Sequence, residues 1–131
     1  MIEGSCHCGK VRWRFGGAPD GATACNCTIC RRYGALWIHD YEGDENINLT
    51  GPSRVYVWGN RKLAFHFCAE CGCVAACRWR NPEADGRHRM AVNVRLADPK
   101  AVESIPIEHF DGLESWKDLG RDGRCVADMW F

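Results

Sequence analysis

Apolar and charged residues alternate along short stretches of the chain, as they do in half-buried β-strands. Residues 11–15 read Val-Arg-Trp-Arg-Phe, with every second side chain apolar. Six further apolar or β-branched runs of similar length follow, at residues 35–38, 47–49, 54–58, 62–67, 74–79 and 90–96. Gly, Pro, Asn and Asp, which favour turns, lie between most of these runs. The pattern therefore predicts seven short strands.

Helical spacing of apolar residues is confined to a short turn at residues 113–116. The chain has no internal repeat beyond its cysteine pairs, and its 131 residues match the usual length of one domain. We therefore expect a single mainly β domain that spans residues 1–131.

The charge balance limits the partners that the chain can attract. Lys and Arg together number 17, as do Asp and Glu, so the formal net charge is zero. No overall positive field is available for phosphate backbones or anionic lipids, and we expect neither nucleic acid nor membrane as a partner. The first twenty residues lack the apolar run of a signal peptide, and no stretch has the roughly 20 apolar residues of a membrane span. We expect a soluble, cytoplasmic protein.

Ten cysteines change this picture of an ordinary β domain. In a reducing cytosol disulfides are not maintained, and close C-x-C or C-x-x-C spacing is typical of metal sites. Cys6 and Cys8 form one such pair near the N-terminus, and Cys68 and Cys71 form another far along the chain. Structural zinc usually takes two thiolates from each of two short loops, so these two pairs together predict one closed, structural zinc site.

Three further thiols, Cys25, Cys27 and Cys30, lie within six residues. Three thiolates from one loop can hold a single zinc ion while water or substrate takes the fourth place, which is typical of catalytic zinc. The alternative is that Cys73, Cys77 or a histidine completes this site and makes it structural as well. We therefore expect two zinc ions, with Cys25, Cys27 and Cys30 at the catalytic one.

Two arginines, Arg31 and Arg32, directly follow the three-cysteine stretch. A guanidinium group pairs with a carboxylate through two parallel hydrogen bonds, so these side chains are candidates for binding the carboxylates of a substrate. Solvated surface charges are an equally good interpretation. The five histidines have no ligand spacing and are interpreted as structural, and most of the tryptophans lie in predicted strands as core or groove lining.

The three cysteine motifs together resemble a known family. They are Gly-Ser-Cys-His-Cys-Gly-Lys-Val at residues 4–11, Cys-Asn-Cys-Thr-Ile-Cys at residues 25–30 followed by Gly34, and Phe-Cys-Ala-Glu-Cys-Gly at residues 67–72. Residues 92–96 and 109–112 are similar to later segments of the same family. By these motifs the chain resembles the glutathione-dependent formaldehyde-activating enzyme family, also called the centromere protein V family.

The resemblance implies a mainly β fold of the kind called a β-tent, built of short antiparallel strands. It assigns the first zinc ion to Cys6, Cys8, Cys68 and Cys71, and the second, catalytic ion to Cys25, Cys27 and Cys30. It also implies a carbon–sulfur lyase type of reaction, in which glutathione and formaldehyde combine to S-hydroxymethylglutathione. Glutathione, or another small thiol, is then the expected partner.

The sequence departs from the family pattern at two motif positions. Thr28 stands where serine is common, which retains a hydroxyl group, and Cys73 stands where threonine or serine often follows the Cys68–Cys71 motif.

In an enzyme of this family, zinc would either deliver a substrate thiolate to a carbonyl carbon or polarise the carbonyl. Three thiolates on one dication favour thiol delivery. The alternative function is a non-catalytic binding module in which two closed zinc sites only build a scaffold.

Overall fold

The computed structural model describes residues 1–130 as a mainly β structure with short helical turns. The strands are β1 (Ile2–Ser5), β2 (Arg12–Phe15), β3 (Ala22–Cys25), β4 (Trp37–Tyr41), β5 (Ile47–Thr50), β6 (Ser53–Val57), β7 (Leu63–Cys68), β8 (Val74–Trp79), β9 (Arg89–Asn93), β10 (Ile107–Asp111) and β11 (Lys117–Gly120). The helical segments are α1 (Cys30–Tyr33), η1 (Val94–Leu96), α2 (Pro99–Val102) and η2 (Val126–Met129).

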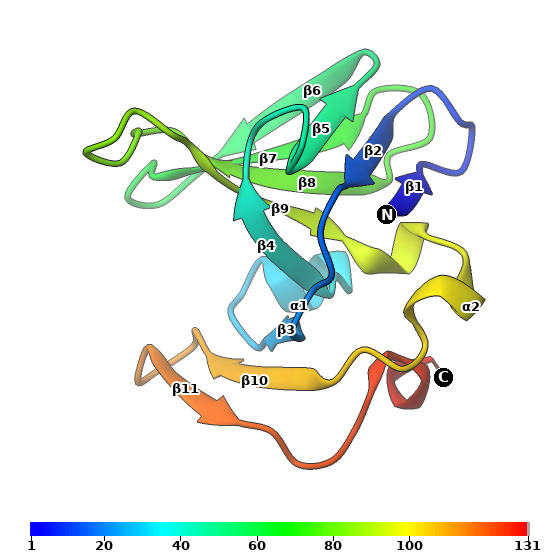
Figure 1. Ribbon diagram of the computed structural model, residues 1–131. Coiled ribbons are helices and arrows are strands. Elements are labelled where there is room, and N and C mark those ends of the chain that lie inside the picture. Colours follow the sequence, from blue (N-terminus) through cyan, green and yellow to red (C-terminus); the bar gives the residue numbers. More distant parts are fainter. Residues whose placement is uncertain (131) are drawn as a thin grey trace.

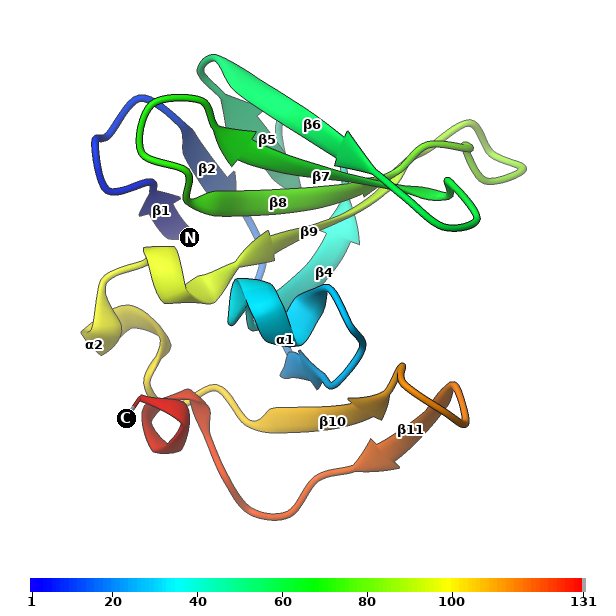
Figure 2. The same ribbon diagram turned by 180° about the vertical axis from the view of Figure 1, so that it is seen from behind.

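The strands form two sheets. The smaller has the order β1-β2-β5, and the larger has the order β11-β10-β3-β4-β9-β8-β7-β6. Figure 1 shows the small sheet beside the β7–β8 end of the large one, while β10 and β11 lie at the opposite end of the molecule. Seen from behind in Figure 2, α1 lies in front of β4, between β9 and β10. The large sheet is thus curved, with α1 on one of its faces.

All seven predicted strands are confirmed, with small shifts at their ends. Four strands were not predicted, namely β1, β3, β10 and β11. The short turn predicted at residues 113–116 is observed as a turn at residues 112–115, which connects β10 to β11 and does not continue into a helix. The predicted strand at residues 90–96 ends early, because β9 stops at Asn93. The Asn93 side chain accepts a hydrogen bond from the backbone N–H of Arg95 and so caps the start of η1.

One strand pair departs from the expected antiparallel arrangement. β10 runs parallel to β3, with Ile107 opposite Ala22 and Phe110 opposite Cys25. Parallel neighbours need a long connection, and here that connection contains most of the chain. The pairing brings residues 107–111 directly beside the strand that leads into the three-cysteine stretch.

The main core lies between the two sheets. Trp13 of β2, Ile38 of β4, Val92 of β9 and Ile107 of β10 are at most 1% exposed and belong to one apolar cluster. Gly4 of β1 makes room for the Trp13 ring, since a Cβ at this position would lie 2.3 Å from it. The alternation predicted for β2 is observed: Arg12 and Arg14 are exposed while Trp13 and Phe15 are buried.

Asn93 is the one polar side chain in the buried set of the described chain, at 5% exposure. Its Oδ1 accepts hydrogen bonds from the backbone N–H groups of Leu36 (3.3 Å) and Arg95 (3.2 Å), and its Nδ2 donates to the carbonyl of Val74 (3.0 Å). A buried polar group needs such partners, because leaving it unpaired costs free energy of folding. Asn93 therefore ties the segments before β4 and at the start of β8 to the end of β9.

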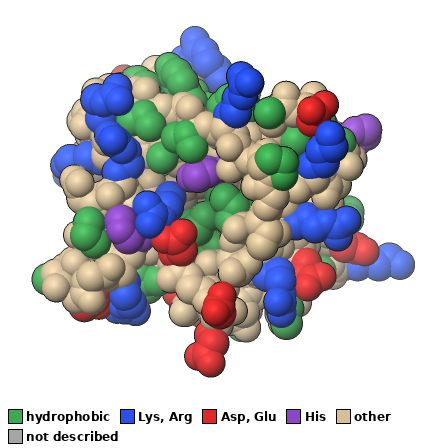
Figure 3. Space-filling model, turned by 90° about the horizontal axis from the view of Figure 1, so that it is seen from above, with side chains coloured by type: hydrophobic (Ala, Val, Ile, Leu, Met, Phe, Trp, Pro, Cys, Tyr) green, Lys and Arg blue, Asp and Glu red, His purple; other side chains and the backbone are tan. Residues whose placement is uncertain are grey.

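The surface carries mixed charges. On the face drawn in Figure 3, Lys and Arg side chains are interspersed with Asp and Glu and with hydrophobic patches, so neither sign dominates that face. Over residues 1–130, the structure contains no helix with the length and apolar character needed to cross a bilayer.

Candidate functional site

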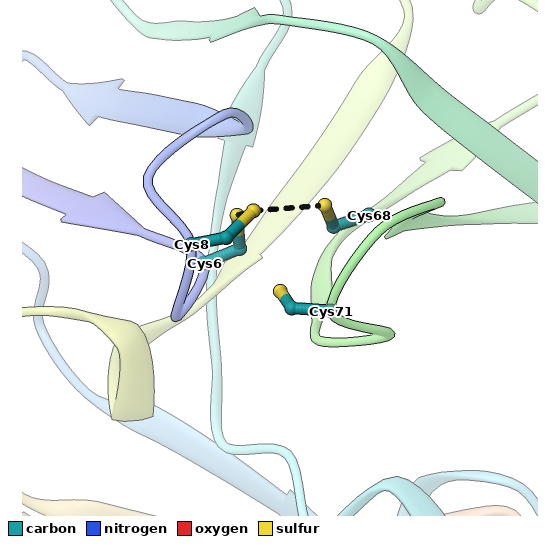
Figure 4. Close-up of side chains that lie close together, drawn as sticks. All are labelled: Cys6, Cys8, Cys68 and Cys71. Carbon is teal, nitrogen blue, oxygen red and sulfur yellow. Dashed lines mark hydrogen bonds between the residues drawn. The ribbon is translucent and has the colours of Figure 1, made fainter.

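The first cysteine group joins the two distant parts of the chain that the sequence paired. The sulfur atoms of Cys6, Cys8, Cys68 and Cys71 lie within 4.8 Å of one another. Figure 4 shows the four side chains pointing toward a common centre from two loops, one after β1 and one after β7. Cys6 Sγ lies 3.6 Å from Cys8 Sγ, and Cys8 Sγ lies 3.5 Å from Cys68 Sγ.

These distances fit a tetrahedral metal site. Zinc–sulfur bonds of about 2.3 Å at tetrahedral angles place neighbouring sulfur atoms about 3.8 Å apart. Four thiols at this spacing form the donor set that structural zinc prefers. The residues present therefore fit the ion.

Tight backbone turns position the first pair. Gly9 N–H donates to the carbonyl of Cys6 at 2.9 Å, and Gly9 has a φ of +80°, a conformation that L side chains rarely adopt. Val11 N–H in turn donates to Cys6 Sγ at 3.3 Å. Burial raises the pKa of the Cys6 thiol, but hydrogen bonds from the Val11 backbone and the neighbouring thiols outweigh it, so the pKa is lowered overall.

The second pair is held by a matching turn. Gly72 N–H donates to the carbonyl of Cys68 at 2.9 Å with a φ of +79°, and Cys68 N–H donates to the carbonyl of Cys73 at 3.0 Å. Hydrogen bonds from the backbone of Cys73 and Cys8 lower the pKa of the Cys71 thiol to about 5. Backbone N–H groups that point at a sulfur favour its thiolate form, which is the form that binds metal.

The second cysteine group consists of Cys25, Cys27 and Cys30, whose sulfur atoms also lie within 4.8 Å of one another. Cys25 ends β3, and Cys30 begins α1. Cys30 N–H donates to Cys27 Sγ at 3.3 Å, and the indole N–H of Trp37 donates to Cys30 Sγ at 3.4 Å. Cys30 is buried, while Cys25 and Cys27 are half-buried.

Because the thiols lie close together, the pKa values of Cys25 and Cys30 shift in opposite directions. A hydrogen bond from the Cys30 thiol is the main cause that lowers the pKa of Cys25, to about 6. The same contact, together with burial, raises the pKa of Cys30 well above its ordinary range. The stretch therefore stabilises one thiolate at neutral pH even before any cation is considered.

A turn from the C-terminal part of the chain packs against this group. Asn26 Nδ2 donates to Asp111 Oδ1 at 3.1 Å, and Leu113 N–H donates to Asn26 Oδ1 at 3.0 Å. Gly112 fits closely against the cysteines: a Cβ there would lie 2.7 Å from Cys25 Sγ and 3.0 Å from Cys27 Cβ. Hydrogen bonds from Ser115 and Asn26 lower the pKa of Asp111 far below its usual value, so this carboxylate stays ionised and holds the turn.

None of the other candidates for a fourth ligand joins the second group within residues 1–130. Cys73 lies at the first group, where it accepts a hydrogen bond from the backbone of His7 and lies near Cys71. Cys77 lies within electrostatic range of Cys25 and Cys27, but burial raises its pKa to about 12. No histidine belongs to either sulfur group over the described residues. In the described part of the chain, the second group thus brings together three potential metal ligands, and their binding of a zinc ion remains a prediction.

The second group lines a pocket of about 1050 Å³. Its floor is one face of the large sheet, and alternate residues of successive strands point into it, among them Trp37 and His39 of β4, Trp79 of β8 and Phe65 of β7. The connections after β3, β6 and β10 form its rim. The first cysteine group does not line this pocket.

The two arginines predicted to bind substrate lie at the outer side of the cysteine stretch. Arg31 is exposed and does not line the pocket. Arg32 donates to the carbonyl of Thr28 at 2.8 Å and lines a smaller hollow of about 250 Å³. Thr28, Ile29 and Trp58 line both cavities, so the hollow adjoins the pocket. A substrate role for these arginines remains a prediction.

Sequence reasoning missed several polar residues that line the pocket, among them His39, Lys62, Arg89 and Glu108. Arg89 lies over the ring of Trp79, with its guanidinium carbon 4.9 Å from the ring centroid. Desolvation by the pocket wall, with Arg89 nearby, lowers the pKa of His39 to about 4. His39 is exposed and lines the pocket. Strand alternation could have located His39, which lies two residues after Trp37 on β4.

Comparisons with known proteins agree with the motifs. The sequence profile of the family described as glutathione-dependent formaldehyde-activating enzyme matches residues 1–109. A relative from Halomonas elongata, provisionally named a glutathione-dependent formaldehyde-activating enzyme, is 27% identical over 145 residues, which cover 97% of this chain and 87% of that protein. A crystal structure of a Rhodobacter sphaeroides protein is similar in fold, with a TM-score of 0.61 and 24% identity, covering 80% of this chain and 98% of that chain.

Proposed function

Because the chain belongs to the glutathione-dependent formaldehyde-activating enzyme family, we propose that it is a zinc-dependent carbon–sulfur lyase that forms or breaks a thiol–aldehyde adduct. S-Hydroxymethylglutathione, the adduct of glutathione and formaldehyde, is the reference substrate. One zinc ion is structural and the other catalytic.

The observation that supports this proposal is the unequal setting of the two cysteine groups. Cys6, Cys8, Cys68 and Cys71 supply four sulfurs and line neither the large pocket nor the smaller hollow, as suits a structural ion. Cys25, Cys27 and Cys30 supply three sulfurs and line a pocket of about 1050 Å³. A binding module built only on closed metal sites would not need this difference, so the enzyme is the better interpretation.

Cys25, Cys27 and Cys30 would hold the catalytic ion. When bound, zinc lowers the pKa of a thiol that coordinates it and so provides a thiolate at neutral pH. The chain keeps the three sulfurs convergent through the hydrogen bonds from Cys30 N–H and the Trp37 indole, and through the packing of Gly112.

The chain's other contributions are orientation and proton placement. As the carbon–sulfur bond forms, the carbonyl π bond becomes a carbon–oxygen single bond and the thiol proton ends on that oxygen. Thr28 lies between Cys27 and Cys30 in the sequence and lines the pocket, so its hydroxyl is available to donate a hydrogen bond to the oxygen. Breakdown of the adduct reverses these steps.

The arginines predicted from the sequence retain a role in this proposal. Glutathione is long enough to extend from the cysteine pocket into the adjoining hollow, where Arg32 lies, and Arg31 is its neighbour. There a substrate carboxylate would meet a guanidinium group.

A metal count combined with turnover tests the proposal. The wild-type chain should hold two zinc ions and accelerate the exchange between glutathione, formaldehyde and their adduct, measured by exchange NMR. Cys27→Ala should hold one zinc and lose the acceleration. Cys125→Ala is the matched control, because Cys125 belongs to neither sulfur group, and it should retain both properties. Two zinc ions in Cys27→Ala, or undiminished exchange, would refute the assignment.

A further inference from the structure

The wall of the cysteine pocket is largely aromatic and aliphatic. Phe65 and Trp79 stand on the sheet floor, Phe110 lies on β10, and Trp58 and Trp116 stand at the rim. Phe110 and Trp116 form an edge-to-face pair with ring centroids 5.7 Å apart. Pockets for organic ligands are typically apolar with a few polar groups, and this one is at the upper end of their usual size.

Several of these apolar side chains remain open to solvent at the pocket mouth. Trp58 is 42% exposed, Leu113 51% and Trp116 67%, and all three line the pocket from opposite rims. Large exposed apolar residues cost free energy in water, and their grouping around one cavity marks a surface that a ligand covers. A hydroxymethyl group is far too small to cover it.

Three of the polar side chains in the wall, Glu108, Asn60 and Arg89, are engaged within the protein. Glu108 accepts two hydrogen bonds from Arg121, at 3.1 and 2.7 Å. Asn60 accepts one from the backbone of Lys62 at 3.1 Å. The guanidinium group of Arg89 lies over Trp79, and its Nε is 4.0 Å from Glu83. These three side chains therefore have less capacity left for the amide groups of a peptide-like ligand, and unpaired amides are costly to desolvate.

From this wall we infer that the preferred substrate is a thiol–aldehyde adduct that carries an aromatic or comparably large apolar group. That group lies between the rims, against Trp79 and Leu113, while the sulfur is at the three cysteines. This inference deepens the proposed function and rests on it. The reaction is unchanged: a carbon–sulfur bond forms, the thiol proton passes to the carbonyl oxygen, and no oxidant or reductant is consumed.

The apolar group can belong to either partner, and two experimental arms separate these cases. One arm compares 2-phenylethanethiol with 2-mercaptoethanol, each reacting with formaldehyde. The other compares phenylacetaldehyde with formaldehyde, each reacting with glutathione. In at least one arm the zinc-loaded full chain should give a kcat/KM about tenfold or more higher for the phenyl compound, because burying a phenyl ring removes a large apolar area from water.

A matched pair of leucine variants connects this preference to the wall. Leu113 and Leu119 lie on the same β10–β11 hairpin and are 51% and 63% exposed, but only Leu113 lines the pocket. Leu113→Ala should reduce the phenyl preference by about threefold or more, and Leu119→Ala should leave it unchanged. Both leucines are exposed, so neither change endangers folding.

Binding of 2-phenylethanol, which has neither thiol nor carbonyl, distinguishes failure of the inference from failure of the proposed function. NMR titration should show weaker binding to Leu113→Ala than to Leu119→Ala. Turnover without a phenyl preference in either arm, or equal effects of the two leucine changes, would overturn the inference and leave the function standing. If 2-phenylethanol binds more weakly to Leu113→Ala than to Leu119→Ala but no adduct is turned over, the proposed reaction is refuted and binding of an apolar ligand is supported.

Discussion

Replacement of Gly112 by alanine tests whether the C-terminal turn shapes the three-cysteine site. Gly112 does not have a positive φ, so alanine fits the backbone and the change is purely steric. The new Cβ would lie 2.7 Å from Cys25 Sγ and 3.0 Å from Cys27 Cβ. Nonbonded carbon contacts are normally about 3.5–4.0 Å, so the turn and the cysteine stretch must separate by roughly 1 Å.

Overpacking of this kind typically costs about 1–3 kcal/mol. If the separation spreads the three sulfurs, the same free energy is lost from zinc binding, which corresponds to about a fivefold to hundredfold weaker affinity. Competition with a chromophoric chelator would measure it. The second zinc should be released earlier than in the wild type, and adduct turnover should fall with it, while release of the first zinc stays the same.

Gly17→Ala is the matched control for this change. Gly17 also lacks a positive φ, and a Cβ there would meet only Phe15 at an ordinary 3.5 Å. We expect its zinc affinities to equal those of the wild type. If Gly112→Ala releases its second zinc as slowly as Gly17→Ala and turns over equally well, the turn does not constrain the cysteine geometry and the reasoning fails.

Two further predictions concern stability. Asn93→Ala leaves the backbone groups of Leu36 and Val74 without their buried partner, and urea unfolding should show a loss of about 2–4 kcal/mol. The control Asn81→Ala, at an exposed position, should change the free energy of unfolding by less than about 0.5 kcal/mol. Equal effects of the two changes would contradict this account. The pKa of His39 is lowered to about 4 in the folded chain, so between pH 6.5 and 4 the unfolded chain binds the additional proton and stability falls as the pH falls. His39→Gln should therefore lose less stability than the wild type between pH 7.5 and 5.0, although contact of the ring with pocket water moderates the difference; identical losses would show that His39 is not involved.

The sequence predicted the strands whose alternation is set by burial. Residues 74–79 form β8 with the predicted ends, because a run of apolar residues in a central strand has one stable placement. β1 and β11 were missed because each is short, contains a glycine and has few buried side chains. Their pairing with β2 and β10, not their own propensity, makes them strands.

The cysteine groups were predictable because metal-ligand spacing is a local property of the chain. The four-sulfur and three-sulfur groups have the predicted members. The pocket was not predictable in the same way, since Trp79 and Phe110 reach it only through the order of strands in the sheet. Nothing local in the sequence indicates that β10 lies parallel to β3, and this pairing places Gly112 against the cysteines.

The parallel pairing of β3 and β10 also sets an order of assembly. The first cysteine group needs residues 60 positions apart, as between Cys8 and Cys68, and can close while the C-terminal third of the chain is still being made. The second group is complete in sequence by Cys30, but the Asn26–Asp111 contact joins residues 85 positions apart. At roughly 5–20 residues per second, the ribosome takes about 4–17 s to add the 85 residues from Asn26 to Asp111, which lies beside the cysteine stretch in the folded chain. During that interval its thiols are open to the cell, so the newly made chain can acquire a cation there before the substrate pocket exists.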